Sequence, residues 1–166
     1  MNARFRLLGV CALLVFLLDQ ASKWLIVHNI PEYHSVTVIS GLFDLVNIRN
    51  RGAAFGFLNR SDIEWQFWLF LAATVLACIA IFIVVRGLKE KASLLVIGLG
   101  GILGGALGNL TDRLRFRAVI DFLDFYWKDW HWPAFNVADS AICVGAFLVC
   151  LVLFFERKEA KPEDLA

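Results

Sequence analysis

Carboxylate and amide side chains stand at the ends of long apolar runs in this chain, where an unpaired charge is costly. The motif NLTD (109–112) closes one apolar run and NVAD (136–139) opens another, and in each motif the asparagine and the aspartate are three residues apart. That spacing puts both side chains on one face of a helix. Two further aspartates, Asp121 and Asp124, lie in the apolar and aromatic segment AVIDFLDFYW (118–127).

Paired carboxylates at such a place could hydrolyse a peptide bond. Two close carboxylates cannot both ionise easily, so one of them holds a proton near neutral pH. The ionised member can then activate a water while the protonated member donates to the carbonyl oxygen. This chemistry needs no metal, serine or cysteine. Asp139 is one candidate, and the residues alone leave Asp112, Asp121 and Asp124 open as its partner.

Each charged residue also has a purely structural interpretation. Asn136 can cap a helix whose third residue is Asp139, a variant of the capping box, and the carboxylate then lies in the first turn, where the helix dipole favours negative charge. Asp112 lies at the opposite end of its helix, where the dipole disfavours it. We therefore expect Asp112 to pair with the adjacent Arg113 or with Arg115.

Other catalytic schemes fit the chain less well. The chain has no HExxH or GxSxG motif. Ser22 and Lys23 are neighbours in sequence and so lie on different helix faces, whereas Asp19 and Lys23 are spaced i, i+4 and can pair structurally. The four cysteines stand inside apolar runs without metal-type spacing: Cys11, Cys78, Cys143 and Cys150. We infer no metal site, no cofactor and no disulfide framework.

Four apolar segments must position these residues. The chain has 166 residues, of which 60% are hydrophobic, and its mean hydropathy is +0.70. The apolar residues gather in segments 5–28, 65–85, 92–110 and 137–155, each near the ~20 residues that cross a bilayer. Segment 5–28 resembles a signal peptide, but it continues past Asp19 and Lys23 without a convincing cleavage site, so we interpret it as an uncleaved helix. A net charge of +1 without a basic stripe gives no argument for nucleic acid.

The flanking charges predict the orientation of these helices. Basic residues are dense in the tails and in the short turn 86–91, which places both termini in the cytoplasm. The loops 29–64 and 111–136 then lie outside, the polar tail 156–166 lies inside, and all six tryptophans gather toward the outer face. Within the first loop, VTVIS (36–40) and LFDLVNI (42–48) predict a small hairpin around Ser40-Gly41 on the membrane surface.

The glycines of GLGGILGGALGN (98–109) form several small-xxx-small pairs. Such pairs let helices approach closely in lipid. Close packing within the bundle is the default interpretation, and a smooth groove for a passing substrate helix is the alternative.

Five motifs in order resemble the bacterial lipoprotein signal peptidases, also called signal peptidase II. They are DQASK (19–23), NRGAAFG (50–56), GGALGNLTDR (104–113), VIDF (119–122) and PAFNVADSAI (133–142). The resemblance implies a mainly α membrane fold: a four-transmembrane-helix bundle with a small extracytoplasmic β-sheet cradle and a short interfacial helix. It also implies a single membrane-embedded peptidase domain over 1–166.

The family resemblance implies a function and a set of site residues. The enzyme would be an aspartic endopeptidase of the bacterial inner membrane that removes the signal peptide from diacylglyceryl-modified prolipoproteins, cutting before the lipidated cysteine at the outer, periplasmic face. The resemblance selects Asp121 and Asp139 as the catalytic pair and Asp19 and Lys23 as structural residues. It places these residues around the substrate or the pair: Asn50, Gly52, Asn109, Asp112, Arg113, Asn136 and Ala138. We expect a monomer in contact with membrane lipid, with apolar walls for lipid or signal helix around Phe55, Phe57, Phe122 and Phe125.

Three other functions remain as alternatives. A small transporter or proton relay could use intramembrane carboxylates, but transport sites tend to lie near the midplane, whereas these acids gather at one interface. A thiol oxidoreductase would need cysteine pairs in the outer loops, which contain none. A non-enzymatic membrane scaffold gives no reason for two NxxD motifs on the same side.

Overall fold

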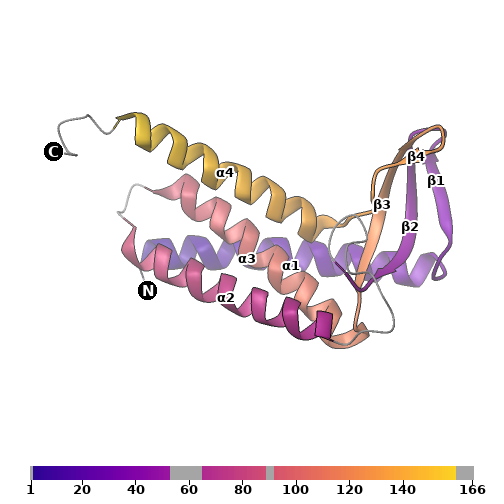
Figure 1. Ribbon diagram of the computed structural model, residues 1–166, viewed down its shortest axis with the longest axis horizontal. Helices are drawn as coiled ribbons and strands as arrows, with labels where there is room; N and C mark the ends of the chain where they lie inside the picture. The colour runs from indigo at the N-terminus through magenta and orange to yellow at the C-terminus, as the bar shows by residue number, and fades with distance from the viewer. Residues whose placement is uncertain (1, 53–64, 89–91, 160–166) are drawn as a thin grey trace.

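Four long helices run side by side, and a small sheet lies across one end of them (Figure 1). The computed structural model describes residues 2–52, 65–88 and 92–159. The helices are α1 (Ala3–Asn29), α2 (Trp65–Gly87), α3 (Ser93–Phe116) and α4 (Val137–Glu159). All four are long and apolar enough to cross a membrane, α4 over Val137–Phe155.

Helix α3 lies between α1 and α4 and meets both of them through glycines. A Cβ at Gly104 would collide with the backbone carbonyl of Ala12 on α1, and a Cβ at Gly105 would collide with that of Ala138 on α4. The missing side chains therefore let the helix backbones touch, as small residues do in lipid. These glycine faces are filled by the bundle's own helices, so the structure favours close packing over a groove for a substrate helix.

Helix α2 packs on α3 at both of its ends. At the end away from the sheet, Ile81 and Val85 join a buried apolar cluster with Leu95, Val96 and Leu99 of α3 and Leu8 of α1. At the sheet end, the contacts are between guanidinium groups and rings. Arg113 lies 4.3 Å from the ring centroid of Phe70, and Arg117 lies 3.9 Å from that of Phe67. Cation–π contacts of this kind stabilise a helix pair where its surface becomes polar.

The sheet has four antiparallel strands in the order β1-β2-β3-β4. They are β1 (Ser35–Ile39), β2 (Phe43–Asn50), β3 (Val119–Trp127) and β4 (Trp130–His131). The predicted hairpin is confirmed as β1 and β2, and its turn uses Gly41 at φ +77°, a conformation that suits glycine. The strands cross the helix ends, so residues of β2 and β3 lie close to the ends of α3 and α4.

Part of the segment 111–136 differs from the expected loop. Helix α3 continues past Leu110 and ends at Phe116, and its C-cap residue Arg117 has a left-handed φ of 56°. Strand β3 then occupies Val119–Trp127, paired with β2. The local sequence gives no pattern that predicts this strand. Nearly all of its first residues are buried, so apolar and polar residues do not alternate along it. The helices among the described residues are the four long ones, so the implied short interfacial helix is not found there.

All six tryptophans lie toward the sheet end of the molecule. Trp24 is near the end of α1, Trp65 and Trp68 are in the first turn of α2, and the others are on or beside β3 and β4: Trp127, Trp130 and Trp132. All of them are exposed. Indole rings favour the membrane–water interface, so the exposed tryptophans at this end of the bundle suit a position at that interface.

Candidate active site

Asp121 and Asp139 come from different elements and share one asparagine. Asp121 is on β3 and accepts hydrogen bonds from Asn136 Nδ2 (2.8 Å) and Asn50 Nδ2 (2.9 Å). Asp139 is in the first turn of α4 and accepts from Asn109 Nδ2 (2.8 Å) and from the backbone N–H of Asn136 (3.2 Å). Asn136 thus contacts both carboxylates and joins them into one site.

Asn136 holds this central position because it caps α4. Its Oδ1 accepts from the backbone N–H of Asp139 at 2.9 Å, while the Asp139 carboxylate accepts from the Asn136 backbone N–H. The predicted reciprocal cap is confirmed. The side chain is fully buried, and its Nδ2 also reaches Ile120 O (3.2 Å) and Asn109 Oδ1 (3.3 Å). The two NxxD motifs therefore meet through their asparagines.

The surroundings of Asp121 favour its protonated form. Burial in the protein, and next the negative charge of Asp139, raise the pKa of Asp121 from 3.8 to about 7, against the hydrogen bonds from Asn50 and Asn136 and the charge of Lys23. Only 3% of the residue is exposed. A carboxyl group with such a pKa can hold and release a proton near neutral pH.

A buried ion cluster lies behind the aspartate pair. Lys23 Nζ is 2.9 Å from Asp19 Oδ2 and 2.7 Å from Asp112 Oδ2, and it donates to Asn109 Oδ1 at 2.9 Å. The predicted Asp19–Lys23 pair is confirmed. The expected pairing of Asp112 with Arg113 or Arg115 is wrong. The tertiary packing of α3 against α1 supplies a buried lysine instead, and we call Lys23, Asp19 and Asp112 the Lys23 cluster.

Gln20 belongs to this arrangement and was not singled out from the sequence. Its Nε2 donates to Asp19 Oδ2 and Asp112 Oδ1, each at 3.1 Å, and reaches Gly108 O at 3.3 Å. A Cβ at Gly108 would collide with the Asp19 carboxylate. The available signal was a polar glutamine at membrane depth, next to Asp19 in DQASK.

The remaining family positions surround the pair. Arg113 Nη2 donates to the backbone carbonyl of Gly52 at 3.1 Å, and the Gly52 N–H donates to Asn50 Oδ1 at 2.9 Å. Ala138 is fully buried, and its N–H donates to Asp19 Oδ1 at 3.0 Å. In the NRGAAFG motif, residues 53–56 lie outside the described part of the chain.

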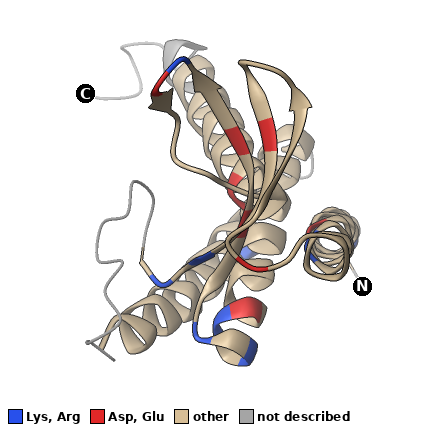
Figure 2. Cartoon of the chain, turned by 90° about the vertical axis from the view of Figure 1, so that its right-hand side faces the viewer, with Lys and Arg blue, Asp and Glu red and all other residues tan. Residues whose placement is uncertain are grey.

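Asp124 is turned to a different partner. In a strand, residues three apart face opposite sides of the sheet, so Asp121 and Asp124 diverge. Both Asp124 oxygens contact Nδ1 of His131, at 2.9 and 3.1 Å. Figure 2, which faces the sheet end, shows acidic residues on the strands and on helices behind them. In the described parts of the chain, no group of three or more His, Cys, Asp or Glu side chains could hold a metal ion.

We expect Asp124→Asn to retain most of the peptidase activity that the sequence motifs imply, because the Asp124 side chain contacts His131 and neither member of the Asp121–Asp139 pair. The measurement is the rate of substrate cleavage at matched protein level, with Asp121→Asn as the matched control on the same strand. A folded but inactive Asp124→Asn protein would move the catalytic role to this second aspartate.

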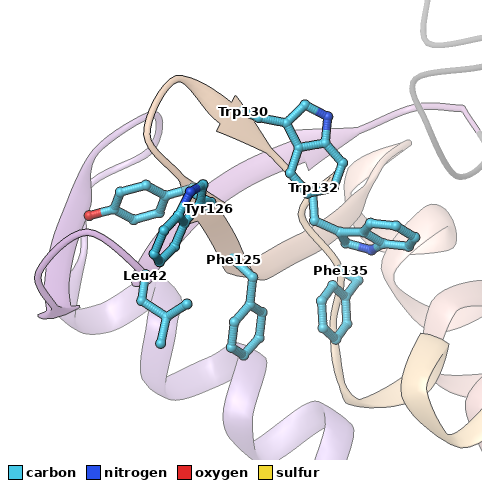
Figure 3. A pocket seen from close by; sticks show the side chains of 7 residues that line it. Leu42, Phe125, Tyr126, Trp130, Trp132 and Phe135 are labelled. Carbon is cyan, nitrogen blue, oxygen red and sulfur yellow. The ribbon is translucent and has the colours of Figure 1, made fainter.

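An aromatic hollow of about 390 Å³ opens on the sheet (Figure 3). Phe125 and Phe135 stack along it with ring centroids 6.0 Å apart, and Phe135 immediately precedes Asn136. The other lining residues are Leu42, Tyr126, Trp127, Trp130 and Trp132.

The structure describes two of the four phenylalanines that were expected to form apolar walls, and it places them differently. Phe125 lines the hollow. Phe122 is buried against Ile26 and Ile30, so it cannot receive lipid as expected. Phe55 and Phe57 lie outside the described residues.

These features define a membrane-spanning protein with an aspartate pair, one member of it buried, at one end of its helices. The model of the signal peptidase (SPase) II family matches residues 11–155, and the chain belongs to this family of peptidases. The resemblance seen in the sequence motifs is confirmed. So is the expected combination of four apolar helices with a small antiparallel sheet.

Relatives and solved structures agree with this membership. The chain is 58% identical to a lipoprotein signal peptidase of Nitratidesulfovibrio vulgaris, over 98% of this chain and 96% of that protein. It is 59% identical to one of Oleidesulfovibrio alaskensis, over 93% and 98%. Two solved structures of a bacterial membrane enzyme are similar. One has a TM-score of 0.78 at 27% identity and covers 92% of this chain and 90% of its own. The other has a TM-score of 0.72 at 28% identity and covers 87% and 90%.

Proposed function

We propose that this peptidase is an aspartic endopeptidase that removes the signal peptide from diacylglyceryl-modified prolipoproteins by cutting before the lipidated cysteine. One observation carries the proposal: Asp121 and Asp139, from separate elements, meet through Asn136 at the tryptophan-rich end of the helices. An exported precursor, anchored by its signal helix and its lipid, presents its scissile bond at such a level. The names of the relatives point to the same substrate class.

The chemistry divides between the two carboxyl groups. Asp139 takes a proton from a water as the water oxygen attacks the scissile carbonyl carbon, and Asp121 gives its proton to the carbonyl oxygen. In the second step the bond to nitrogen breaks, and the proton held by Asp139 passes to the leaving amine. Asp121 then recovers its proton as the carbonyl re-forms. The raised pKa of Asp121 supports its role as the acid.

Amide side chains orient the pair in this scheme. Asn50, Asn109 and Asn136 each donate to one of its oxygens. A carboxylate held by two fixed donors keeps one rotamer, which is the preorganisation that catalysis needs. Arg113, held by its contact with Gly52, supplies positive charge near both aspartates.

The direct test is cleavage of a purified lipidated prolipoprotein by the purified chain in detergent or bilayer, followed by mass spectrometry of both products. We expect one cut, with the modified cysteine as the new N-terminal residue. A cut elsewhere, or none by folded protein, would contradict the proposed activity. A transporter is disfavoured because the acids gather at one end of the helices and not at their middle.

The pH dependence of the reaction should show the titration of the Asp121 carboxyl group. Since the pKa of Asp121 is raised to about 7, we expect the turnover rate to fall as the pH rises through neutrality. The stability of the fold should change with pH in the same direction. A carboxyl group whose pKa is raised in the folded state stabilises the fold at low pH, and this contribution is lost as the pH rises from about 4 to about 7. The measurement is a pH–rate profile, in which Asp124→Asn should keep the native alkaline limb. A rate unchanged well above neutral pH would exclude Asp121 as the acid.

The proposed topology places both termini in the cytoplasm and the aspartate pair at the outer face of the bacterial inner membrane, within one peptidase domain that acts as a monomer. Basic residues near the termini and tryptophans at the sheet end support this orientation. Reporter fusions after Lys161 should read as cytoplasmic, and fusions at Gly41 in the β1–β2 turn should read as extracytoplasmic. The reversed pattern would put the pair on the wrong side for exported substrates.

A further inference from the structure

The Asp112 carboxylate accepts a hydrogen bond from the backbone next to Asp121, one member of the aspartate pair. Its Oδ2 accepts a hydrogen bond from the N–H of Ile120 at 3.2 Å, and Ile120 immediately precedes Asp121 on β3. The Asp112 side chain is almost fully buried. This bond therefore ties the start of β3 to a fixed point on α3.

The Asp19 carboxylate makes the equivalent contact beside the other member. Its Oδ1 accepts from the N–H of Ala138 at 3.0 Å, and Ala138 immediately precedes Asp139 in the first turn of α4. Asp19 is also fully buried. Each candidate catalytic aspartate thus follows a residue whose peptide N–H is held by a buried carboxylate.

Lys23 joins the two holding carboxylates to each other. Its Nζ lies 2.9 Å from Asp19 Oδ2 and 2.7 Å from Asp112 Oδ2, and Gln20 Nε2 forms a second bridge at 3.1 Å to each of them. Ion pairs in a dry interior are held far more tightly than those in water. One cation therefore connects the backbones of β3 and α4, which come together only in the folded chain.

Lys23 does not reach the aspartate pair itself. Within the described ranges, its ion pairs go to Asp19 and Asp112, and none goes to Asp121 or Asp139. Lys23 can therefore affect the reaction by positioning other groups and through the electric field of its charge, but not by proton transfer.

We propose that the Lys23 cluster sets the separation of Asp121 and Asp139 by holding the peptide N–H that precedes each of them, which makes Lys23, Asp19 and Asp112 positioning residues. This inference rests on the proposed catalytic role of the pair. The asparagines fix the rotation of the two carboxyl groups, and the Lys23 cluster fixes the backbone that carries them. A misplacement of about 1 Å in such a pair can cost about 100-fold in rate.

The first test compares two substitutions that differ in their ability to accept a hydrogen bond. Asp112→Asn keeps an oxygen for the Ile120 N–H, whereas Asp112→Leu has a similar volume and no acceptor. We expect Asp112→Leu to lower kcat about 100-fold with KM little changed, and Asp112→Asn to lose far less. Ser22→Ala is the matched control, because Ser22 precedes Lys23 on α1 and, among the described residues, its hydroxyl donates within its own helix, to Asp19 O. Native kcat in folded Asp112→Leu protein would overturn the proposal.

A second variant keeps the net charge of the Lys23 cluster and serves as the test if Asp112→Leu fails to fold. The double variant Lys23→Met/Asp112→Asn removes one positive and one negative charge, so the cluster keeps the net charge of −1 that it has in the native protein. Within the described part of the chain, the charged groups that act on Asp121 include Asp139 of α4, Lys23 of α1 and Arg113 of α3. Since the charge of Lys23 lowers the pKa of Asp121, we expect a lower kcat and an alkaline limb moved to higher pH. Because the charge of Lys23 acts on Asp121 whatever the role of the cluster, kcat is the quantity that tests positioning, and a native kcat in the folded double variant would overturn the proposal.

The two proposals fail in different ways. If Asp121→Asn and Asp139→Asn proteins remain active, the catalytic assignment is wrong and there is no pair to position. If those variants are inactive while the folded Lys23-cluster variants keep native kcat, only the positioning role is wrong.

Discussion

Asp121→Asn and Asp139→Asn are each expected to abolish prolipoprotein cleavage while the protein stays folded in the membrane. An amide neither takes a proton from water as a carboxylate does nor supplies an acidic proton. General acid–base catalysis contributes about 10²–10⁴-fold in rate for each group, so either loss brings the rate close to background. Because we propose that the two groups act in one step, the double variant should be little worse than either single variant.

The fold should survive these substitutions for reasons visible in the site. At position 139 an amide oxygen can still accept from the backbone N–H of Asn136, so the α4 cap is retained. At position 121 an amide removes an acid that burial already disfavours in its ionised form. Thermal unfolding and membrane insertion are the accompanying measurements, with Asp124→Asn as the control from the same strand. Normal turnover in either single variant, at matched expression, would remove that residue from the catalytic pair.

A prolipoprotein that lacks the diacylglyceryl group is expected to be cut far more slowly than its modified form. The aspartate pair lies at the ends of the helices, so a scissile bond must be held at that depth to react. One acyl chain anchors a peptide only marginally, and two do so stably. Orientation of a reacting bond can be worth about 7–11 kcal/mol of barrier at the extreme, and even a small part of this is a large effect on rate.

The aromatic hollow offers a surface where such a lipid could contact the enzyme. Its walls are apolar and exposed, and Phe135 leads directly into Asn136. The experiment compares matched precursors, with and without the diacylglyceryl group, in the same bilayer and at saturating enzyme. Equal rates would show that the enzyme recognises the peptide sequence alone, and lipid presentation would have to be abandoned.

The features that depend on short stretches of chain could be predicted from the sequence. The cap formed by Asn136 and Asp139 spans three residues, and the Asp19–Lys23 pair spans one helical turn, so helical periodicity is enough to define both. The four apolar helices and the β1–β2 hairpin follow from local hydropathy and turn chemistry in the same way. The sequence also contained the five ordered motifs, and these alone selected Asp121 as the partner of Asp139.

Only the tertiary structure decided which distant groups meet. Residue patterns left Asp112, Asp121 and Asp124 equivalent, and β3 separates two of them by turning Asp121 and Asp124 to opposite faces. Asp112 meets Lys23, far away in the chain, because glycines let α3 approach α1 closely enough for their buried charges to touch. The pKa of Asp121 is likewise a property of burial and of the neighbouring Asp139. Electrostatic energies depend on distance and dielectric environment, and for residues far apart in sequence both are set only when the helices and the sheet have packed.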